Sequence, residues 1–170
     1  MFFELTNPNF FDEHEINQID FILSNFYVDE QPFIDEKGTN DYFRKYVEIE
    51  HFKNYKSKLE NFIYNKFNCS VVLSNYWINQ VKPETNKKDN FHKDKSDFTA
   101  ITFLNDNYEG GEFEYIDTKT GEKVKVKPKK FNVLFMNNNL QHRVLPVKKG
   151  ARYSLISFMK YNDKKIKSIL

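Results

Sequence analysis

The chain has 170 residues, of which 26 are Lys or Arg and 24 are Asp or Glu, so its net charge is +2. A chain of this length can bury a substantial core as a single domain, residues 1–170. The near balance of charge argues against nucleic-acid binding, which usually requires a strong basic excess. The only cysteine, Cys69, excludes an intrachain disulfide and a cysteine-rich metal site, and we expect it to be a small buried residue.

No stretch of about 18 apolar residues is present, so the sequence predicts no transmembrane helix and no membrane partner. Residues 1–4 lack the basic segment and apolar run that begin a signal peptide. We therefore expect a soluble cytoplasmic protein that is a monomer or a weak homo-oligomer.

The N-terminal part of the chain predicts two helices after an extended segment over residues 1–9. A helix start with acidic residues in its first turn is followed by apolar residues at helical spacing: Ile16, Ile19, Ile22, Leu23 and Phe26. Polar residues 29–41 predict a loop, and helical spacing returns over residues 44–67. His14 and His51 lie in these helices, and we interpret them as exposed residues rather than metal ligands.

From residue 70 onward the chain consists of short β-branched and aromatic segments separated by turn residues. They predict strands near residues 71–78, 90–94, 98–104, 112–116, 123–127, 131–136, 142–147 and 152–160. Lys123, Lys125 and Lys127 alternate with valines, which favours the solvent face of a half-exposed strand over a basic binding patch. The sequence predicts a mostly β fold, a cupin-like jelly roll of about eight strands, over residues 70–161, with helical support over residues 10–67.

A candidate metal site begins with His92 and Asp94, which are two residues apart and would point to the same face of an extended strand. His142 would complete a two-His-one-carboxylate triad, which leaves open positions on a non-haem Fe(II). Arg152 follows ten residues after His142 and offers a planar, permanently charged partner for a carboxylate. The ordered set of these four residues, rather than any one of them, indicates a site.

Each member of this set also has a structural alternative. His92 could be a surface histidine, and His142 could be a strand-end histidine packed on an apolar neighbour. Arg152 could form a cross-strand ion pair with Glu112 or Glu114.

Over residues 91–161 the chain resembles the Fe(II)/2-oxoglutarate-dependent dioxygenases of the prolyl 4-hydroxylase-like branch. The resemblance rests on a series of segments in order: Phe91-His92-Lys93-Asp94, Thr102-Phe103-Leu104-Asn105, Glu109-Gly110-Gly111-Glu112-Phe113, Pro128-Lys129-Lys130-Phe131-Asn132-Val133-Leu134-Phe135, Gln141-His142-Arg143-Val144 and Gly150-Ala151-Arg152-Tyr153-Ser154-Leu155. It implies a double-stranded β-helix in which His92, Asp94 and His142 bind Fe(II). It also implies that Arg152 binds the distal carboxylate of 2-oxoglutarate.

The resemblance further implies an activity in which O₂ and 2-oxoglutarate are consumed, succinate and CO₂ are released, and an unactivated C–H is hydroxylated. Ascorbate is a further cofactor that it suggests. The favoured target is a prolyl residue of a peptide or protein. Hydroxylation of another residue or of a free amino acid stays open, as do a non-oxygenase cupin-like metal-binding module and a non-catalytic interaction domain.

Two further residues are candidates for binding the cosubstrate. Ser154 lies two positions after Arg152, so on a strand both side chains would face the same way. Tyr76, on the strand before the His92 segment, could supply a phenolic donor, although related enzymes place their tyrosine nearer to the histidine.

The segment from Asp35 to Arg44 is a candidate lid over a peptide substrate. Tyr42, Phe43 or Trp77 could then pack on a proline ring. The alternative is that Tyr42 and Phe43 only dock the segment on the core.

Overall fold

The computed structural model describes residues 2–6, 8–26, 33–34, 41–83, 90–127 and 129–162 of the chain. The helices are α1 (Glu13–Ser24), the 3-10 helix η1 (Ile49–Phe52) and α2 (Lys53–Phe67). The strands are β1 (Phe2–Leu5), β2 (Phe33–Ile34), β3 (Asp41–Tyr46), β4 (Val71–Val81), β5 (Phe98–Phe103), β6 (Glu109–Gly110), β7 (Phe113–Ile116), β8 (Lys123–Val126), β9 (Val133–Asn137), β10 (His142–Val144), β11 (Val147–Lys149) and β12 (Arg152–Tyr161).

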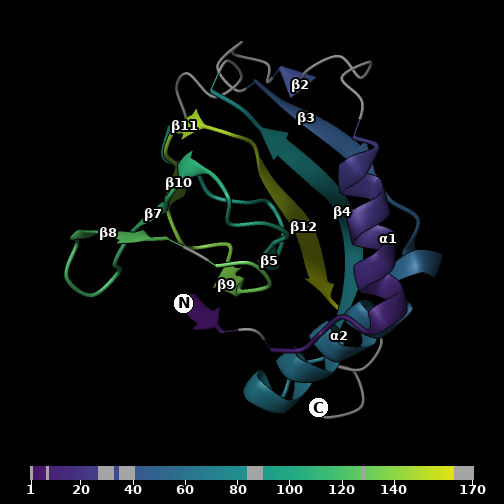
Figure 1. The fold of residues 1–170 in the computed structure, drawn as a ribbon. Helices are drawn as coiled ribbons and strands as arrows, with labels where there is room; N and C mark the ends of the chain where they lie inside the picture. The colour runs from purple at the N-terminus through teal and green to yellow at the C-terminus, as the bar shows by residue number, and fades with distance from the viewer. Residues whose placement is uncertain are drawn as a thin grey trace.

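A large sheet has the strand order β1-β9-β5-β12-β4-β3-β2, and two small sheets have the orders β10-β7-β8 and β11-β6. Figure 1 shows α1 and α2 on one side of the large sheet and the strands of the small sheets on its other side. We call these sides the helix face, which carries Ile78 and Leu155, and the inner face, which carries Trp77 and Ile156. Each face buries its own apolar cluster, and the fold is the predicted jelly roll with supporting helices.

Helix α1 confirms the first predicted helix. Asp12 accepts a hydrogen bond from the Glu15 N–H, and the Glu15 carboxylate accepts one from the Asp12 N–H, which is a capping box. Ile19 is fully buried, whereas His14 is exposed as expected. The buried Glu15 carboxylate also accepts a hydrogen bond from the Tyr55 N–H at 2.9 Å, which joins α1 to the first turn of α2.

The prediction of one helix over residues 44–67 is wrong at its start. Residues 41–46 form β3, and η1 precedes α2. Strand β3 pairs with β4 so that Phe43 lies opposite Gln80, and Phe43 is buried in the cluster on the helix face. Cross-strand pairing decided the structure here, because periodicity does not separate helix from strand over so short a segment. His51 lies in η1 and is exposed, as expected.

Two predicted strands differ from the structure. In the described chain residues 90–94 form no strand, and the β-pairing of this segment is an isolated antiparallel bridge between His92 and His142. The predicted strand over 142–147 is divided into β10 and β11, because Pro146 has no N–H to donate to a ladder. Strand β11 pairs with β6, where Gly110 has φ +75° and any Cβ would lie 2.5 Å from the Pro146 carbonyl oxygen.

The structure shows how far Cys69 and the lysines of residues 123–127 are exposed. Cys69 is half-buried against the cluster on the helix face rather than fully buried, and burial raises the pKa of its thiol. Lys123, Lys125 and Lys127 are all exposed, as the alternating pattern predicted. Within the described ranges, no helix is both long and apolar enough to cross a membrane.

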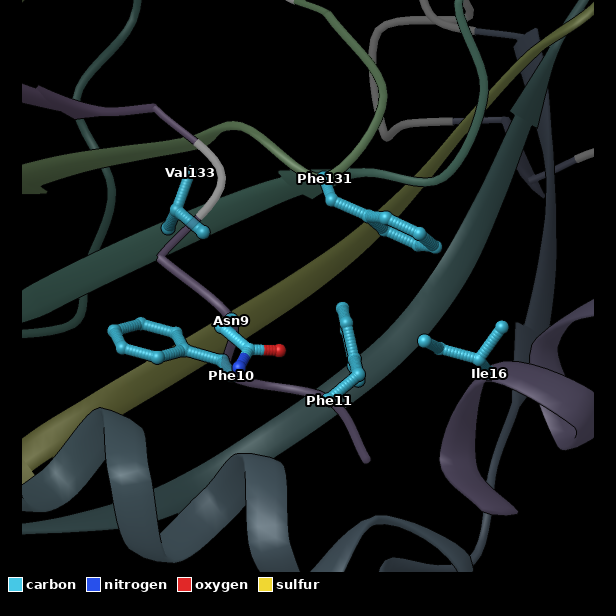
Figure 2. Close-up of a pocket in the computed structure, with 6 residues that line it drawn as sticks. All are labelled: Asn9, Phe10, Phe11, Ile16, Phe131 and Val133. Atoms are coloured by element: carbon cyan, nitrogen blue, oxygen red, sulfur yellow. The ribbon is translucent and has the colours of Figure 1, made fainter. Parts of the chain in front are cut away.

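A small cavity of about 40 Å³ lies where the segment before α1 meets the large sheet (Figure 2). It is lined by Asn9, Phe10, Phe11, Ile16, Phe131 and Val133. The space accommodates little more than a water molecule, whose share of liquid volume is about 30 Å³. We therefore regard it as a packing gap and not as a substrate site.

Candidate active site

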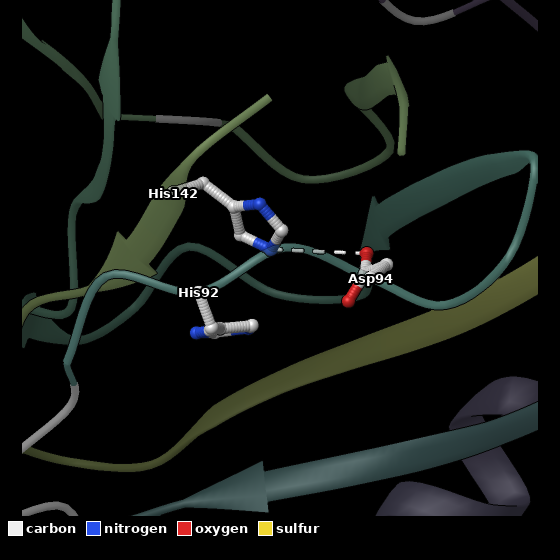
Figure 3. Close-up of side chains that lie close together, drawn as sticks. All are labelled: His92, Asp94 and His142. Carbon is white, nitrogen blue, oxygen red and sulfur yellow. Dashed lines mark ion pairs between the residues drawn. The ribbon is translucent and has the colours of Figure 1, made fainter. Parts of the chain in front are cut away.

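His92, Asp94 and His142 come together between the sheets, as the sequence predicted. One ligand atom from each residue lies within 4.8 Å of the others. The imidazole centroids are 4.5 Å apart, and His142 Nε2 lies 3.8 Å from Asp94 Oδ2 (Figure 3). His142 is buried, Asp94 is half-buried and His92 is exposed, so the cluster is reachable from one side.

Both imidazoles are held in the same tautomer by the backbone. His92 Nδ1 lies 3.0 Å from the Asn90 carbonyl oxygen, and His142 Nδ1 lies 3.1 Å from the Leu140 carbonyl oxygen. A carbonyl oxygen can only accept, so in each neutral ring Nδ1 carries the proton and Nε2 carries the lone pair. Such a hydrogen bond on the second ring nitrogen is the usual way in which a protein orients a metal-binding histidine.

The two histidine segments are also bound to each other. The His92 N–H donates to the His142 carbonyl at 2.9 Å, and the His142 N–H donates to the His92 carbonyl at 3.0 Å. Next to them, the Arg143 guanidinium lies 4.5 Å from the centroid of the Phe91 ring, and its Nε donates to the buried Glu114 carboxylate at 2.6 Å. These contacts replace the strand pairing that residues 90–94 lack.

Arg152 begins β12 and is 97% buried, since only 3% of its surface is exposed. Its Nη1 donates to the Gly111 carbonyl at 3.2 Å, and its guanidinium lies 5.7 Å from the centroid of the Phe103 ring. The described contacts pair Glu114 with Arg143 and Lys125. Because the Glu114 carboxylate is engaged by these two residues, the structure favours a buried cationic site at Arg152 over the alternative of a cross-strand ion pair with Glu114.

Two hydroxyl groups accompany this guanidinium. Ser154 follows on the same face of β12 and is fully buried, and its Oγ has no hydrogen-bond partner among the described residues. The buried Tyr108 hydroxyl likewise has no partner there. Burial raises the pKa of Tyr108 and the charge of Arg152 opposes that shift, so the phenol is a neutral donor at physiological pH. A cation with two buried donors matches a carboxylate ligand.

Tyr76 does not join this group. It lies opposite Ser157 in the β4–β12 pairing, and Ser157 faces helix α2, where its Oγ lies 3.0 Å from the Tyr55 hydroxyl. Directly opposite residues share a face, so Tyr76 is on the helix face and Ser154 is on the inner face. The register shifts between Phe158 and Met159, so no residue of β12 lies directly opposite Ser74, whose Oγ donates to the Phe158 carbonyl at 3.0 Å. The extra residue reverses the alternation of faces along β4.

The inner face also carries an aromatic surface on β3 and β4. Tyr46 lies opposite Trp77, and Arg44 lies opposite Asn79. The Arg44 guanidinium is 3.8 Å from the centroid of the indole ring, and its Nη1 donates to the Tyr46 hydroxyl at 3.0 Å. Tyr46 is 67% exposed, so this surface is open to a ligand. Of these residues, only Trp77 was predicted to contact substrate, because the sequence did not predict a strand over residues 41–46.

The donor set fits a non-haem Fe(II) centre. Two neutral imidazole nitrogens and one carboxylate are the ligands of the facial triad, which leaves positions for other groups. Mg²⁺ fits less well, because its sites use oxygen ligands. Two histidines and a carboxylate also hold catalytic zinc, so the donor set by itself does not separate Fe(II) from zinc.

Residues 71–160 match the family model described as the 2OG-Fe(II) oxygenase superfamily. The match covers just over half of the 170 residues and includes the triad and Arg152. The chain belongs to the 2OG-Fe(II) oxygenase superfamily. Superfamily members use Fe(II), 2-oxoglutarate (2OG) and O₂, so the chain is a 2OG-dependent dioxygenase. No curated protein is similar enough in sequence to match the chain.

Several solved structures share the superfamily fold with this chain. A prolyl-4-hydroxylase from Pseudomonas putida has a TM-score of 0.70 at 13% identity, and the match covers 94% of this chain and 91% of that one. A prolyl hydroxylase from Trichoplax adhaerens, in complex with a hypoxia inducible factor peptide fragment, has a TM-score of 0.69 at 15% identity, covering 99% and 86%. HygX from Streptomyces hygroscopicus, with nickel, 2-oxoglutarate and hygromycin B bound, has a TM-score of 0.65 at 12% identity, covering 95% and 83%.

Proposed function

We propose that His92, Asp94 and His142 bind Fe(II) in this oxygenase. The observation that carries the proposal is that one ligand atom from each of the three residues lies within 4.8 Å of the others. In addition, Nδ1 of each ring faces a backbone carbonyl oxygen, which leaves Nε2 as the lone-pair nitrogen. When bound, the ion supplies the site at which O₂ and 2OG react. The chain itself holds the two rings and the carboxylate in place and leaves one side of the cluster open through the exposed His92.

We propose that Arg152 binds the distal carboxylate of 2OG, with Ser154 and Tyr108 as additional donors. The burial of Arg152 supports this, because a buried guanidinium is stabilised by an anionic partner. The two hydroxyls support it because each is buried without a partner in the described chain. Tyr76 is not part of this proposal, since it lies on the other face of the sheet.

For the prime substrate we propose a prolyl residue of a peptide or protein, which is hydroxylated with release of succinate and CO₂. Support comes from the prolyl hydroxylases among the structures that share this fold. The surface formed by Arg44, Tyr46 and Trp77 is suited to hold such a substrate, because aromatic side chains pack well against a proline ring and against peptide groups. Dependence on ascorbate is part of the proposal and is tested by omitting it from the assay.

The proposed lid needs revision. Its residues 35–40 lie outside the described residues, as does the side chain of Tyr42. Phe43 is buried on the helix face, so it follows the alternative in which it docks on the core. We therefore transfer the proposed contact with substrate from Phe43 to Tyr46, which is exposed on the inner face beside Trp77.

A second class of substrate is a small molecule, such as a free amino acid. HygX shows that this fold can bind a small molecule together with 2-oxoglutarate. Superfamily membership removes the support for a non-oxygenase cupin-like module. It leaves the choice between a peptide and a small molecule to experiment, because a shared fold does not determine the substrate.

The deciding experiment has two stages. Anaerobic titration with Fe(II) and then 2OG should show one site for each ligand. Candidate proline-containing peptides and free amino acids are then incubated with the loaded enzyme in air, and mass spectrometry is used to look for the gain of one oxygen atom. If proline peptides stay unmodified while an amino acid is hydroxylated, the prolyl assignment is wrong and the oxygenase assignment stands.

A further inference from the structure

We propose that Thr99, supported by Ser96, is a positioning residue that fixes the orientation of the Asp94 carboxylate at the metal. The proposal rests on the proposed Fe(II) site and extends it to residues that the sequence motif does not include. Thr99 Oγ1 lies 2.6 Å from Asp94 Oδ2, and Ser96 Oγ lies 2.9 Å from Thr99 Oγ1. Thr99 is 2% exposed and Ser96 is 5% exposed, so water competes little for these bonds.

The direction of the hydrogen bonds follows from a count of protons. An ionised carboxylate can only accept, so the Thr99 hydroxyl must donate its single proton to Asp94. Ser96 must then donate to Thr99, because the Thr99 proton is already used. The result is a directed chain from Ser96 to Thr99 to Asp94 that ends on a negative charge, where hydrogen bonds are shorter and stronger than between neutral groups.

Asp94 needs such support because its own backbone provides little. The described residues 90–94 form no strand, and the only bridge in that segment is at His92. The terminal torsion of an aspartate side chain is broad and roughly two-fold, so the carboxylate could otherwise rotate. Thr99 is a rigid anchor by comparison, because β5 pairs with β12 on one side and with β9 on the other.

The loop between Asp94 and Thr99 is also fixed at Asp97. The Asp97 N–H donates to the Met159 carbonyl at 3.0 Å, and the Tyr161 N–H donates to the Asp97 carboxylate at 2.9 Å. These bonds to β12 fix the loop, and so they fix the distance between the Asp94 carboxylate and Thr99. Asp94 Oδ2, which accepts from Thr99, is also the oxygen that lies 3.8 Å from His142 Nε2, so this hydrogen bond fixes the carboxylate on the side that faces the other candidate ligand.

The test measures metal affinity by anaerobic calorimetry with Fe(II), and repeats it with Mn(II). Thr99→Val keeps the shape but removes the donor, and we expect Fe(II) to bind about 10- to 100-fold more weakly. Thr99→Ser restores the hydroxyl and should return the Kd close to that of the unsubstituted protein. Ser96→Ala, which removes only the far end of the chain of hydrogen bonds, should weaken binding by less than Thr99→Val.

The melting temperature of the metal-free variants separates positioning from simple structural support. If Thr99→Val lowers the melting temperature but binds Fe(II) with unchanged affinity, the proposal is overturned. Should Thr99→Val fail to fold, Ser96→Ala decides, and an unchanged Kd in that variant overturns the proposal. If the unsubstituted protein itself binds no Fe(II), the proposed metal site fails, which is a distinct result from an unchanged Thr99 variant.

Discussion

The helix face and the inner face of the large sheet are formed by the same strands, but their buried hydroxyl groups differ in whether they have hydrogen-bond partners. Ser154 and Ser157 both lie on β12, and both are fully buried. On the helix face, Ser157 Oγ and Thr102 Oγ1 lie 3.0 Å and 3.1 Å from the Tyr55 hydroxyl. On the inner face, Ser154 Oγ has no partner in the described part of the chain.

This contrast separates stability from ligand binding. A buried hydroxyl without a partner is destabilising by about 1–3 kcal/mol, so it is expected where a ligand completes the hydrogen bonding. Substitutions of these polar groups on the helix face should therefore lower the free energy of unfolding and leave ligand affinities unchanged. Substitutions on the inner face should weaken ligand binding and leave the free energy of unfolding nearly unchanged.

The largest expected effect is at the metal ligands. His92→Ala, Asp94→Ala and His142→Ala should each abolish 2OG turnover, because a three-ligand site rarely tolerates the loss of one ligand, and each should keep a folded far-UV spectrum. His51→Ala, at an exposed histidine in η1, is the matched control and should keep full turnover. Full 2OG decarboxylation by any of the three variants would contradict the ligand assignment.

Arg152→Ala should have the next largest effect. Loss of a buried partner for a carboxylate typically costs about 2–5 kcal/mol, so the apparent KM for 2OG should rise about 30-fold to several-thousand-fold. Affinity for Fe(II), measured separately, should change far less. An unchanged KM would return Arg152 to the role of a structural cation.

Tyr153→Phe is the control for Arg152→Ala, because Tyr153 is the next residue of β12 and faces the other side. Its hydroxyl accepts a hydrogen bond from Gln80 Nε2 at 2.6 Å. The control should lower the melting temperature and leave the KM for 2OG unchanged. A raised KM in both variants would show that the two faces are not separable at this end of the strand.

Tyr46→Ala tests the proposed substrate surface. We expect peptide hydroxylation to fall at least about tenfold, a loss of about 1.4 kcal/mol of transition-state stabilisation, while 2OG decarboxylation without peptide stays unchanged. Lys45→Ala is the control, because Lys45 lies opposite Ile78 and so faces the helices. Equal loss of both activities in Tyr46→Ala would remove the assignment of Tyr46 to the substrate.

The smallest effect gives the most direct comparison. Ser157→Ala should lower the free energy of unfolding by about 0.5–1.5 kcal/mol, because it removes a satisfied hydrogen bond. Ser154→Ala should not lower it, but should raise the Kd for 2OG severalfold. Chemical denaturation measures the free energy of unfolding, and calorimetry measures the Kd for 2OG. If both variants change the two quantities in the same way, the proposed difference between the faces is wrong.

The sequence by itself determined what depends on neighbouring residues. The capping pair Asp12 and Glu15 marks the start of α1, because its hydrogen bonds span only three residues. The order of the His92 segment, His142 and Arg152 carried enough information to predict the family. These features hold in any register of the sheet, so they could be predicted without knowledge of its pairing.

Tertiary structure decided which face each side chain occupies. An irregular register at Ser74 reverses the alternation along β4, which places Tyr76 on the helix face. A shift of one residue in the register moves a side chain to the other face of the sheet. No local sequence pattern predicted the shift at Ser74. In the same way, only the folded structure brings Tyr108 beside Arg152, because the two residues are far apart in sequence and meet only when their segments pack together.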